Sequence, residues 1–306
     1  MTTANAIAKQ VNRAIARDDG PVRGCPLHLV LAEKIRSDAS SNMPVSPADI
    51  VRGMDRQEFV LEYQPQFDIV DCAQPLSGVE ALVRWNHPRL GFLSPGQFMH
   101  AIQSAGLEFE LGTCVLGMAI DQIKTWLNST GWSPRVSVNM AAEHLDSENL
   151  SKNVMRALHA SQIGANYLEI EILESAVIRH MDRAARELQS LREMGVRVAI
   201  DDFGMGTASF HSLLQLPCDT IKLCAEFVQG IGHGTGADEI CKAVIHLGSS
   251  LSKHVVAEGV ETRAQLEFLR QHGCHEVQGY LLGRPVIGDV FSRLFMKCKS
   301  RYISQA

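Results

Sequence analysis

Short runs rich in apolar and β-branched residues alternate with longer segments of helical periodicity along most of the chain. The runs predicted as strands are residues 59–63, 78–84, 135–140, 167–172, 197–200, 220–223, 254–257 and 276–280. The segments predicted as helices include residues 111–127, 149–161, 181–194, 239–251 and 263–272. Strands that alternate with helices predict right-handed crossovers and a parallel sheet. About eight such units in roughly 250 residues favour an α/β fold of the closed (β/α)₈ TIM-like barrel type, with an open doubly wound sheet as the second alternative.

The first 47 residues differ from the rest of the chain. Residues 4–16 fit a short amphipathic helix and residues 27–35 a second one, followed by a Ser/Asp-rich linker. Ser46 and Pro47 then form a helix start, with Ser46 as N-cap. We therefore expect an N-terminal helical segment and linker (1–47), a barrel domain (48–295) and a C-terminal tail (296–306). Two alternatives stay open for residues 1–48, a helix that binds a protein partner and a poorly ordered leader.

Composition narrows the class of function. The formal net charge is -5 in 306 residues, which argues against charge-driven binding to DNA, since that needs a basic face. No run approaches the ~18 apolar residues of a membrane span, and the N-terminus lacks a signal-peptide pattern. The eight cysteines are scattered without a C-x-x-C pair. This pattern favours free thiols, and the sequence predicts a cytoplasmic protein.

Polar side chains interrupt the predicted strands at or near their C-terminal ends. They are Glu80, Asn139, Glu171, Asp201, Asp202, Lys222, Glu258 and Gln278. In a barrel these ends open on one face, where active sites lie. Any one of them alone is readily explained as a satisfied structural polar group. Five carboxylates converging in one cleft cannot all stay ionised without a cation, however, so the set predicts a bound divalent metal.

The types of ligand select the class of metal. Carboxylate and amide oxygens, without His or Cys, suit hard cations such as Mg²⁺ or Mn²⁺. Asp201 and Asp202 end a strand, where the backbone can turn so that both face the cleft and one bridges two ions. Two ions can clamp a phosphate and activate water. Lys222 and Arg84 supply positive charge for phosphate oxygens or for orienting the nucleophile.

The same residues carry a resemblance to a known family. Glu80-Ala81-Leu82-Val83-Arg84-Trp85 is similar to the signature of EAL domains, which are cyclic di-GMP phosphodiesterases. Tyr63-Gln64-Pro65 resembles the opening strand of that family. Further motifs follow in the family's order, at Asn139, Glu171 with Glu174, Asp201-Asp202-Phe203-Gly204, Lys222, Glu258 with Glu261, and Gln278. The resemblance covers residues 48–290, and seven motifs in order are very specific.

The resemblance implies a barrel with one antiparallel strand and hydrolysis of cyclic di-GMP to linear pGpG with two Mg²⁺ or Mn²⁺ ions. It assigns the first ion to Glu80, Asn139, Glu171 and Asp201, and the second to Asp201, Asp202 and Glu258. Lys222 would orient the attacking water, supported by Glu258, Glu261 and Gln278 as further catalytic residues. Gln64 and Arg84 would contact the substrate. The loop after Asp202 would form a homodimer, with Glu174 as its anchor.

Some positions depart from the family's usual residues. They are Leu173, Met205 and Thr207 around the dimer loop, with Ala141 and Cys224. None removes a predicted metal ligand, so these departures bear on rate and dimer coupling more than on chemistry. The main rival function is a catalytically weak or inactive cyclic di-GMP receptor that signals through its dimer loop or N-terminal helices. A kinase reading of Asp202-Phe203-Gly204 fails because no glycine-rich phosphate loop accompanies it.

Overall fold

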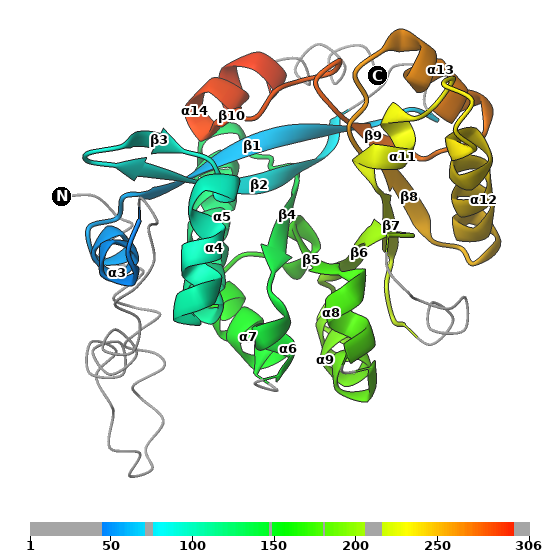
Figure 1. The fold of residues 1–306 in the computed structure, drawn as a ribbon. Coiled ribbons are helices and arrows are strands. Elements are labelled where there is room, and N and C mark those ends of the chain that lie inside the picture. The colour runs from blue at the N-terminus through cyan, green and yellow to red at the C-terminus, as the bar shows by residue number, and fades with distance from the viewer. Residues whose placement is uncertain (1–44, 71–75, 147–148, 180, 206–215, 297–306) are drawn as a thin grey trace.

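The computed structural model describes residues 45–70, 76–146, 149–179, 181–205 and 216–296 (Figure 1). Within them eight strands close into a barrel: β1 (Phe59–Asp68), β2 (Leu76–His87), β4 (Arg135–Met140), β5 (Leu168–Leu173), β6 (Arg197–Phe203), β7 (Thr220–Leu223), β8 (His254–Ala257) and β9 (Glu276–Gln278). Neighbours are parallel except β1, which pairs antiparallel with both β2 and β9. The predicted barrel with one antiparallel strand is confirmed.

Two short strands lie outside this ring. β3 (Gly91–Leu93) pairs with the far end of β2, and β10 (Val286–Ile287) pairs with β1. β2 therefore runs on past the barrel to His87, and it pairs with β4 only from Gly78 to Ala81. The sequence predicted that Glu80 lies at or near the end of its strand. In the structure it lies in the first half of the long strand β2. It nevertheless lies at the end of the parallel ladder, which places it at the barrel mouth.

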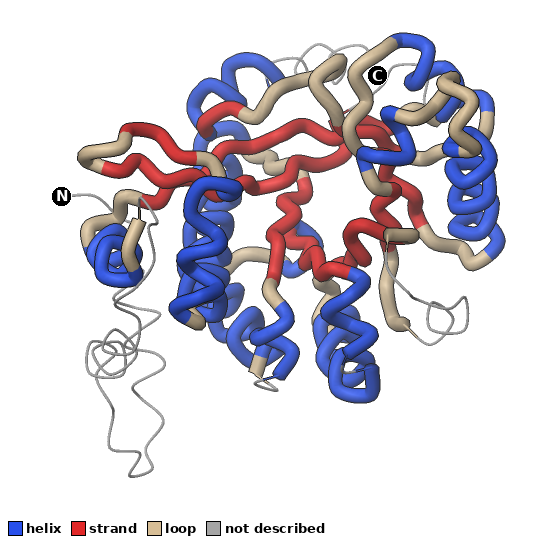
Figure 2. Tube along the Cα trace, viewed as in Figure 1, coloured by secondary structure: helices blue, strands red, loops and turns tan. Residues whose placement is uncertain are grey.

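Helices surround the strands, as Figure 2 shows. They are α3 (Pro47–Asp55), α4 (Pro95–Ala105), α5 (Glu108–Thr130), α6 (Ala142–Asp146), α7 (Leu150–Ser161), α8 (Glu174–Arg179), α9 (Met181–Glu193), α11 (Ala225–Gln229), α12 (Ala237–Ser250), α13 (Arg263–Gln271) and α14 (Gly288–Phe291), with the single turns η1 (Ala165–Tyr167) and η2 (Ser292–Met296). On α5, Leu111, Val115 and Ala119 recur at helical spacing and are buried against the barrel. No helix in these described ranges is long and apolar enough to cross a bilayer.

Helix α3 begins with the predicted cap. The backbone N–H of Asp49 donates to Ser46 Oγ at 3.2 Å, and the N–H of Ser46 donates to Asp49 Oδ2 at 3.1 Å. Together with Pro47 at the first helical position, this capping box fixes where α3 starts. The helices predicted over 4–16 and 27–35, and Thr207, lie outside the described residues.

Gly279 holds the end of β9 against the loop that follows β8. The Val260 N–H donates to the carbonyl of Gln278 at 3.0 Å, and the Leu281 N–H donates to the carbonyl of Val260 at 3.1 Å. A Cβ at residue 279 would overlap the backbone oxygen and nitrogen of Val260. β9 ends at Gln278 and Glu258 directly follows β8, so the absence of a side chain at residue 279 allows the segments that carry these two predicted site residues to approach each other.

We expect Gly279→Ala to lower the free energy of unfolding by about 3 kcal/mol, because backbone rather than a flexible side chain must move. Denaturant titration measures this. Gly117→Ala is the matched control, since a Cβ at that helical position meets no atom within 4 Å. It should leave stability unchanged or raise it by up to about 1 kcal/mol. Equal stability of the two variants would contradict the close approach.

Candidate active site

Lys222 lies at the centre of the barrel mouth, on β7, with its side chain fully buried. Its Nζ lies 2.5 Å from Glu171 Oε2, 2.6 Å from Glu258 Oε1, 3.2 Å from Asp201 Oδ1 and 3.6 Å from Glu80 Oε2. These carboxylates come from β5, the end of β8, β6 and β2. The predicted convergence of acids from several strands is thus present in the structure, and one ammonium joins four of them.

Asp201 and Asp202 both turn into this cluster. The register of β6 against β7 shifts between Ile200 and Phe203. Asp202 has a φ of 52°, in the left-handed region that short polar side chains tolerate. One carboxylate oxygen each from Asp201, Asp202 and Glu258 lie within 4.8 Å of one another. The bulge therefore brings adjacent acids to one point, as the sequence predicted.

Amide side chains hold Glu80. Asn139 Nδ2 donates to Glu80 Oε1 at 2.7 Å, and Gln278 Nε2 donates to Glu80 Oε2 at 2.6 Å. Gln278 Nε2 also lies 3.0 Å from Gln64 Oε1, and Gln66 Nε2 donates to Gln278 Oε1 at 3.0 Å. Gln66 was not among the predicted site residues. Its signal in the sequence is its spacing of two from Gln64, which puts both amides on one face of β1.

The charges in the cluster are unbalanced. Burial raises the pKa of Glu258 to about 7, against the opposing effect of Lys222. Burial also raises the pKa of Glu171 well above its ordinary value, and the nearby Glu80 and Asp201 add to the shift. For Lys222 burial lowers the pKa, but the four carboxylates outweigh it and raise the pKa well above normal. One permanent cation therefore faces an excess of acids.

The donor set fits a hard divalent cation. Glu171 Oε1 is buried and has no hydrogen-bond partner among the described residues. The three oxygens of Asp201, Asp202 and Glu258 form a second group of acceptors, within 4.8 Å of one another. Oxygen ligands of this kind suit hard cations, and added positive charge would relieve the repulsion that raises the carboxyl pKa values. The site is therefore a candidate metal centre.

Other predicted residues lie around this centre. Glu174 Oε2 accepts from the Gly204 N–H at 2.7 Å, which ties the start of α8 to the segment after Asp202. Arg84 Nε donates to Glu62 Oε2 at 2.8 Å. Glu261 is exposed, and its side chain makes no hydrogen bond within the described part of the chain. Of the residues that depart from the family pattern, Leu173 and Met205 are exposed.

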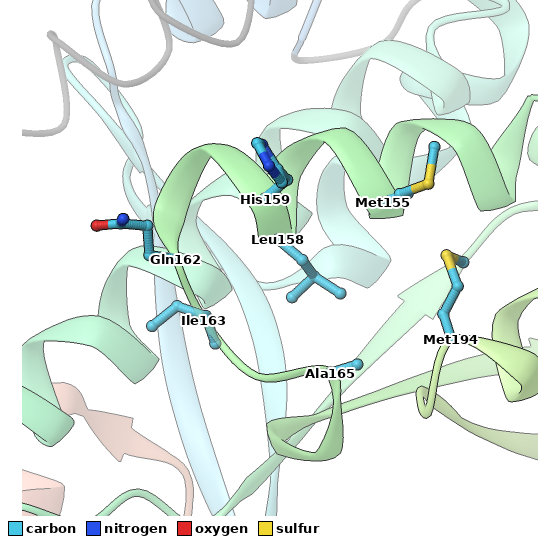
Figure 3. A pocket seen from close by; sticks show the side chains of 7 residues that line it. All are labelled: Met155, Leu158, His159, Gln162, Ile163, Ala165 and Met194. Atoms are coloured by element: carbon cyan, nitrogen blue, oxygen red, sulfur yellow. The ribbon is translucent and has the colours of Figure 1, made fainter.

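A separate cavity of about 550 Å³ lies elsewhere, where α7 connects to β5. Its lining residues are Met155, Leu158, His159, Gln162, Ile163, Ala165 and Met194 (Figure 3). This connection precedes β5, whereas the acid cluster lies at the opposite ends of the strands. The lining contains no carboxylate, so this cavity is not part of the candidate metal centre.

Comparison with known proteins places the chain in a family. The EAL domain model matches residues 48–285. The bifunctional diguanylate cyclase/cyclic di-GMP phosphodiesterase MucR of Pseudomonas aeruginosa is 37% identical over 238 residues, which are 78% of this chain and 34% of that protein. The cyclic di-GMP phosphodiesterase PA2567 of the same organism is 36% identical over 231 residues, 76% of this chain and 39% of that protein. This chain thus spans about a third of the length of these relatives.

A solved structure agrees in both fold and sequence. The PaMucR phosphodiesterase in complex with c-di-GMP superposes with a TM-score of 0.76 at 36% identity, covering 80% of this chain and 98% of that one. With the family model spanning most of the chain and a barrel of the same build, this protein belongs to the EAL domain family.

Proposed function

We propose that this chain is a metal-dependent phosphodiesterase that hydrolyses cyclic di-GMP to linear pGpG. The observation that carries the proposal is the cluster of Lys222 with Glu80, Glu171, Asp201 and Glu258, which are four of the five predicted acids. The fifth, Asp202, has a carboxylate oxygen within 4.8 Å of those of Asp201 and Glu258. The names of two relatives as cyclic di-GMP phosphodiesterases support it. So does the c-di-GMP complex of the similar PaMucR structure.

The residues divide between two metal positions in this proposal. Glu80, Asn139, Glu171 and Asp201 would hold one Mg²⁺ or Mn²⁺, and Asp201, Asp202 and Glu258 a second. When bound, such cations activate water and neutralise charge on a phosphodiester. Glu171 Oε1, which is buried without a partner among the described residues, is the clearest acceptor for the first ion. Glu261, which is exposed, would support the site.

In the reaction, the oxygen of water forms a bond to phosphorus and one P–O3′ bond breaks. The water loses a proton, and the leaving O3′ gains one, so that a 5′-phosphorylated linear dinucleotide results. The Lys222 ammonium is held within 3.6 Å of four carboxylates. Because its raised pKa keeps it charged, it acts by donating to the water and the phosphate, not as a base.

Gln64 and Arg84 would bind the substrate. Gln64 lies opposite Glu80 across the β1–β2 pair. Arg84 lies four residues further along β2, an even spacing that puts it on the same face of the strand as Glu80. Arg84 Nε and Nη1 donate to Glu62 and to the carbonyl of Val83. Nη2 has no hydrogen bond within the described ranges, so this end of the guanidinium is available to a phosphate oxygen.

We further propose that residues 48–295 form the phosphodiesterase domain and that the loop after Asp202 joins two copies, with Glu174 as its anchor. The Glu174–Gly204 hydrogen bond supports a coupling between that loop and the acid cluster. Leu173 and Met205 are exposed on either side of this contact, at 44% and 51%. Apolar side chains at this place fit a surface that a second copy covers. Residues 1–48 remain a candidate for binding another protein.

A turnover assay tests the function. Purified protein with Mg²⁺ or Mn²⁺ should convert cyclic di-GMP to pGpG, whereas Ca²⁺ in place of either ion should give no product. The physical reason is that Ca²⁺ prefers a larger and looser shell of oxygens. Chromatography of the nucleotides measures this, with a chelator as control. Tight binding without turnover in Mg²⁺ and Mn²⁺ would instead assign the chain as a receptor.

A further inference from the structure

A chain of buried side-chain hydrogen bonds connects the floor of the barrel to Glu80. Arg135 Nη2 donates to Gln66 Oε1 at 3.4 Å, and Gln66 Nε2 donates to Gln278 Oε1 at 3.0 Å. Gln278 Nε2 then donates to Glu80 Oε2 at 2.6 Å. We propose that Gln66 is a positioning residue that fixes the amide of Gln278 and, through it, the carboxylate of Glu80 for metal binding. The inference rests on the proposed role of Glu80 as a metal ligand.

The two ends of this series of hydrogen bonds determine the donor and acceptor at every step. An arginine has only donors, so Arg135 must face the oxygen of the Gln66 amide. An ionised carboxylate has only acceptors, so Glu80 must face the nitrogen of Gln278. Between them each amide has one orientation that satisfies both neighbours, with oxygen toward Arg135 and nitrogen toward Glu80. Turning either amide would oppose two oxygens or two nitrogens.

The backbone holds the two glutamines in contact. Gln66 of β1 lies opposite Gln278 of β9 in the antiparallel register, and opposite Gly78 of β2 on its other side. A Cβ at residue 78 would lie 2.6 Å from Gln66 Oε1 and 3.1 Å from Arg135 Nη2. The glycine thus leaves the room in which the arginine and the amide meet. Gln66 itself is 1% exposed, so water does not compete for its bonds.

The guanidinium of Arg135, where the series of hydrogen bonds begins, is fixed by other buried contacts. Its Nη2 lies 2.8 Å from Glu276 Oε2, which also accepts from Ser77 Oγ at 3.0 Å. Its Nε forms an ion pair with Glu169 Oε2 at 2.5 Å, although the atoms are not aligned for a hydrogen bond. The guanidinium therefore cannot turn away from Gln66 without breaking other buried contacts.

Besides the Lys222 ammonium at 3.6 Å from Oε2, Glu80 is held by two side-chain amides. Asn139 holds Oε1, and Gln278 holds Oε2. The Gln278 amide has two orientations, and in only one of them does Nε2 donate to Gln64 and Glu80. The hydrogen bond from Gln66 Nε2 to Gln278 Oε1 favours that orientation. Loss of an outer partner of a metal ligand typically costs 10–100-fold in metal affinity or activity, which sets the expected size of the effect.

The test compares Gln66→Met and Gln66→Glu with wild type in the full chain. Methionine removes both the donor and the acceptor at similar volume. Glutamate keeps the acceptor for Arg135 but offers no donor, so it favours a turned Gln278 that presents oxygen to Glu80. Titration calorimetry with Mn²⁺ alone should give about 10-fold weaker binding for Gln66→Met and more than 10-fold for Gln66→Glu. Gln103→Glu, on the exposed face of α4, should bind Mn²⁺ as wild type does.

A turnover series adds a signature that a merely structural role would not give. Raising Mn²⁺ should restore kcat of Gln66→Met toward wild type while KM for cyclic di-GMP changes little. Wild-type Mn²⁺ affinity in both variants, folded by circular dichroism, would overturn the inference, as would an absence of Mn²⁺ binding in wild type. If neither variant folds, a crystal structure of wild type with Mn²⁺ decides, and separation of Gln66 Nε2 from Gln278 beyond 3.5 Å overturns it.

This design separates the inference from the proposed function. Calorimetry with Mn²⁺ uses no nucleotide, so it reports the metal site even if the substrate is not cyclic di-GMP. Wild-type protein that binds Mn²⁺ but leaves cyclic di-GMP intact would defeat the proposed activity alone. Weakened Mn²⁺ binding by the two variants would in that case still support Gln66 as the positioning residue.

Discussion

The Lys222→Met protein should be about 3 kcal/mol less stable than wild type at pH 8 without divalent cations, and it should lose turnover. Removing one partner of a buried ion pair leaves the other charges uncompensated, at a cost of roughly 3–5 kcal/mol. Here Nζ lies between Glu171 and Glu258 at 2.5 and 2.6 Å, with two further carboxylates within 3.6 Å. In the described part of the chain, no other lysine or arginine forms an ion pair with these four acids.

The loss of stability in this variant should depend on pH in a definite direction. The folded-state pKa of Glu258 is already about 7, above the ordinary 4.5, so folding favours the protonated acid. Stability therefore falls as pH rises from about 4.5 through 7, and removal of Lys222 extends this effect. The difference between variant and wild type should be small near pH 4.5 and largest above pH 7.

Urea denaturation across this pH range measures the effect. Mg²⁺ or Mn²⁺ should restore part of the stability, because a cation replaces the lost ammonium. Lys242→Met is the matched control, since Lys242 pairs with Glu239 on the surface of α12 and should leave stability unchanged at every pH. A pH-independent loss of stability in the Lys222 variant would show that packing, rather than charge, accounts for it.

Replacing Glu80 by alanine should reduce kcat more than about 100-fold while leaving the fold near intact. The loss exceeds that expected for an outer partner because Glu80 is itself a proposed metal ligand. Asn139 and Gln278 each lose a charged acceptor, but the crowding of carboxylates around Lys222 falls at the same time. These opposing changes keep the free energy of unfolding close to that of wild type.

Steady-state kinetics with cyclic di-GMP and Mg²⁺ would measure this loss, and circular dichroism the fold. Glu143→Ala is a suitable control because it removes an exposed carboxylate from α6. Near-normal kcat in the Glu80 variant would refute its role. A matching loss in the Glu143 variant would instead show that the assay responds to surface charge.

Much of the barrel was predictable from local pattern. The strands 135–140, 220–223 and 254–257 have the predicted bounds, because each is an apolar run between turn residues. The helix starting at Pro47 was also predictable, since its cap is encoded within four residues. The acids could be placed at one mouth because parallel strands align their ends.

The missed features depend on distant contacts. β1 was predicted to end at Tyr63 but continues to Asp68, because Gln64 and Gln66 find partners on β2 and β9 inside the barrel. In isolation, two glutamines look like the end of a strand. β3 and α4 also escaped prediction, since Gly91–Leu93 is a strand only through its pairing with β2. The partners of Gln66 lie 69 and 212 residues away, beyond any local window.

The antiparallel seam has a consequence for how the protein is made. β1 joins β2 soon after both emerge from the ribosome, but its other neighbour, β9, is among the last strands to be synthesised. The Gln278–Glu80 bond spans 198 residues of sequence. Contacts of such separation form late because loop closure must come first. A nascent chain would therefore display its acids without the amide that orders Glu80, and competence to bind metal would arise only as the final strand closes the ring.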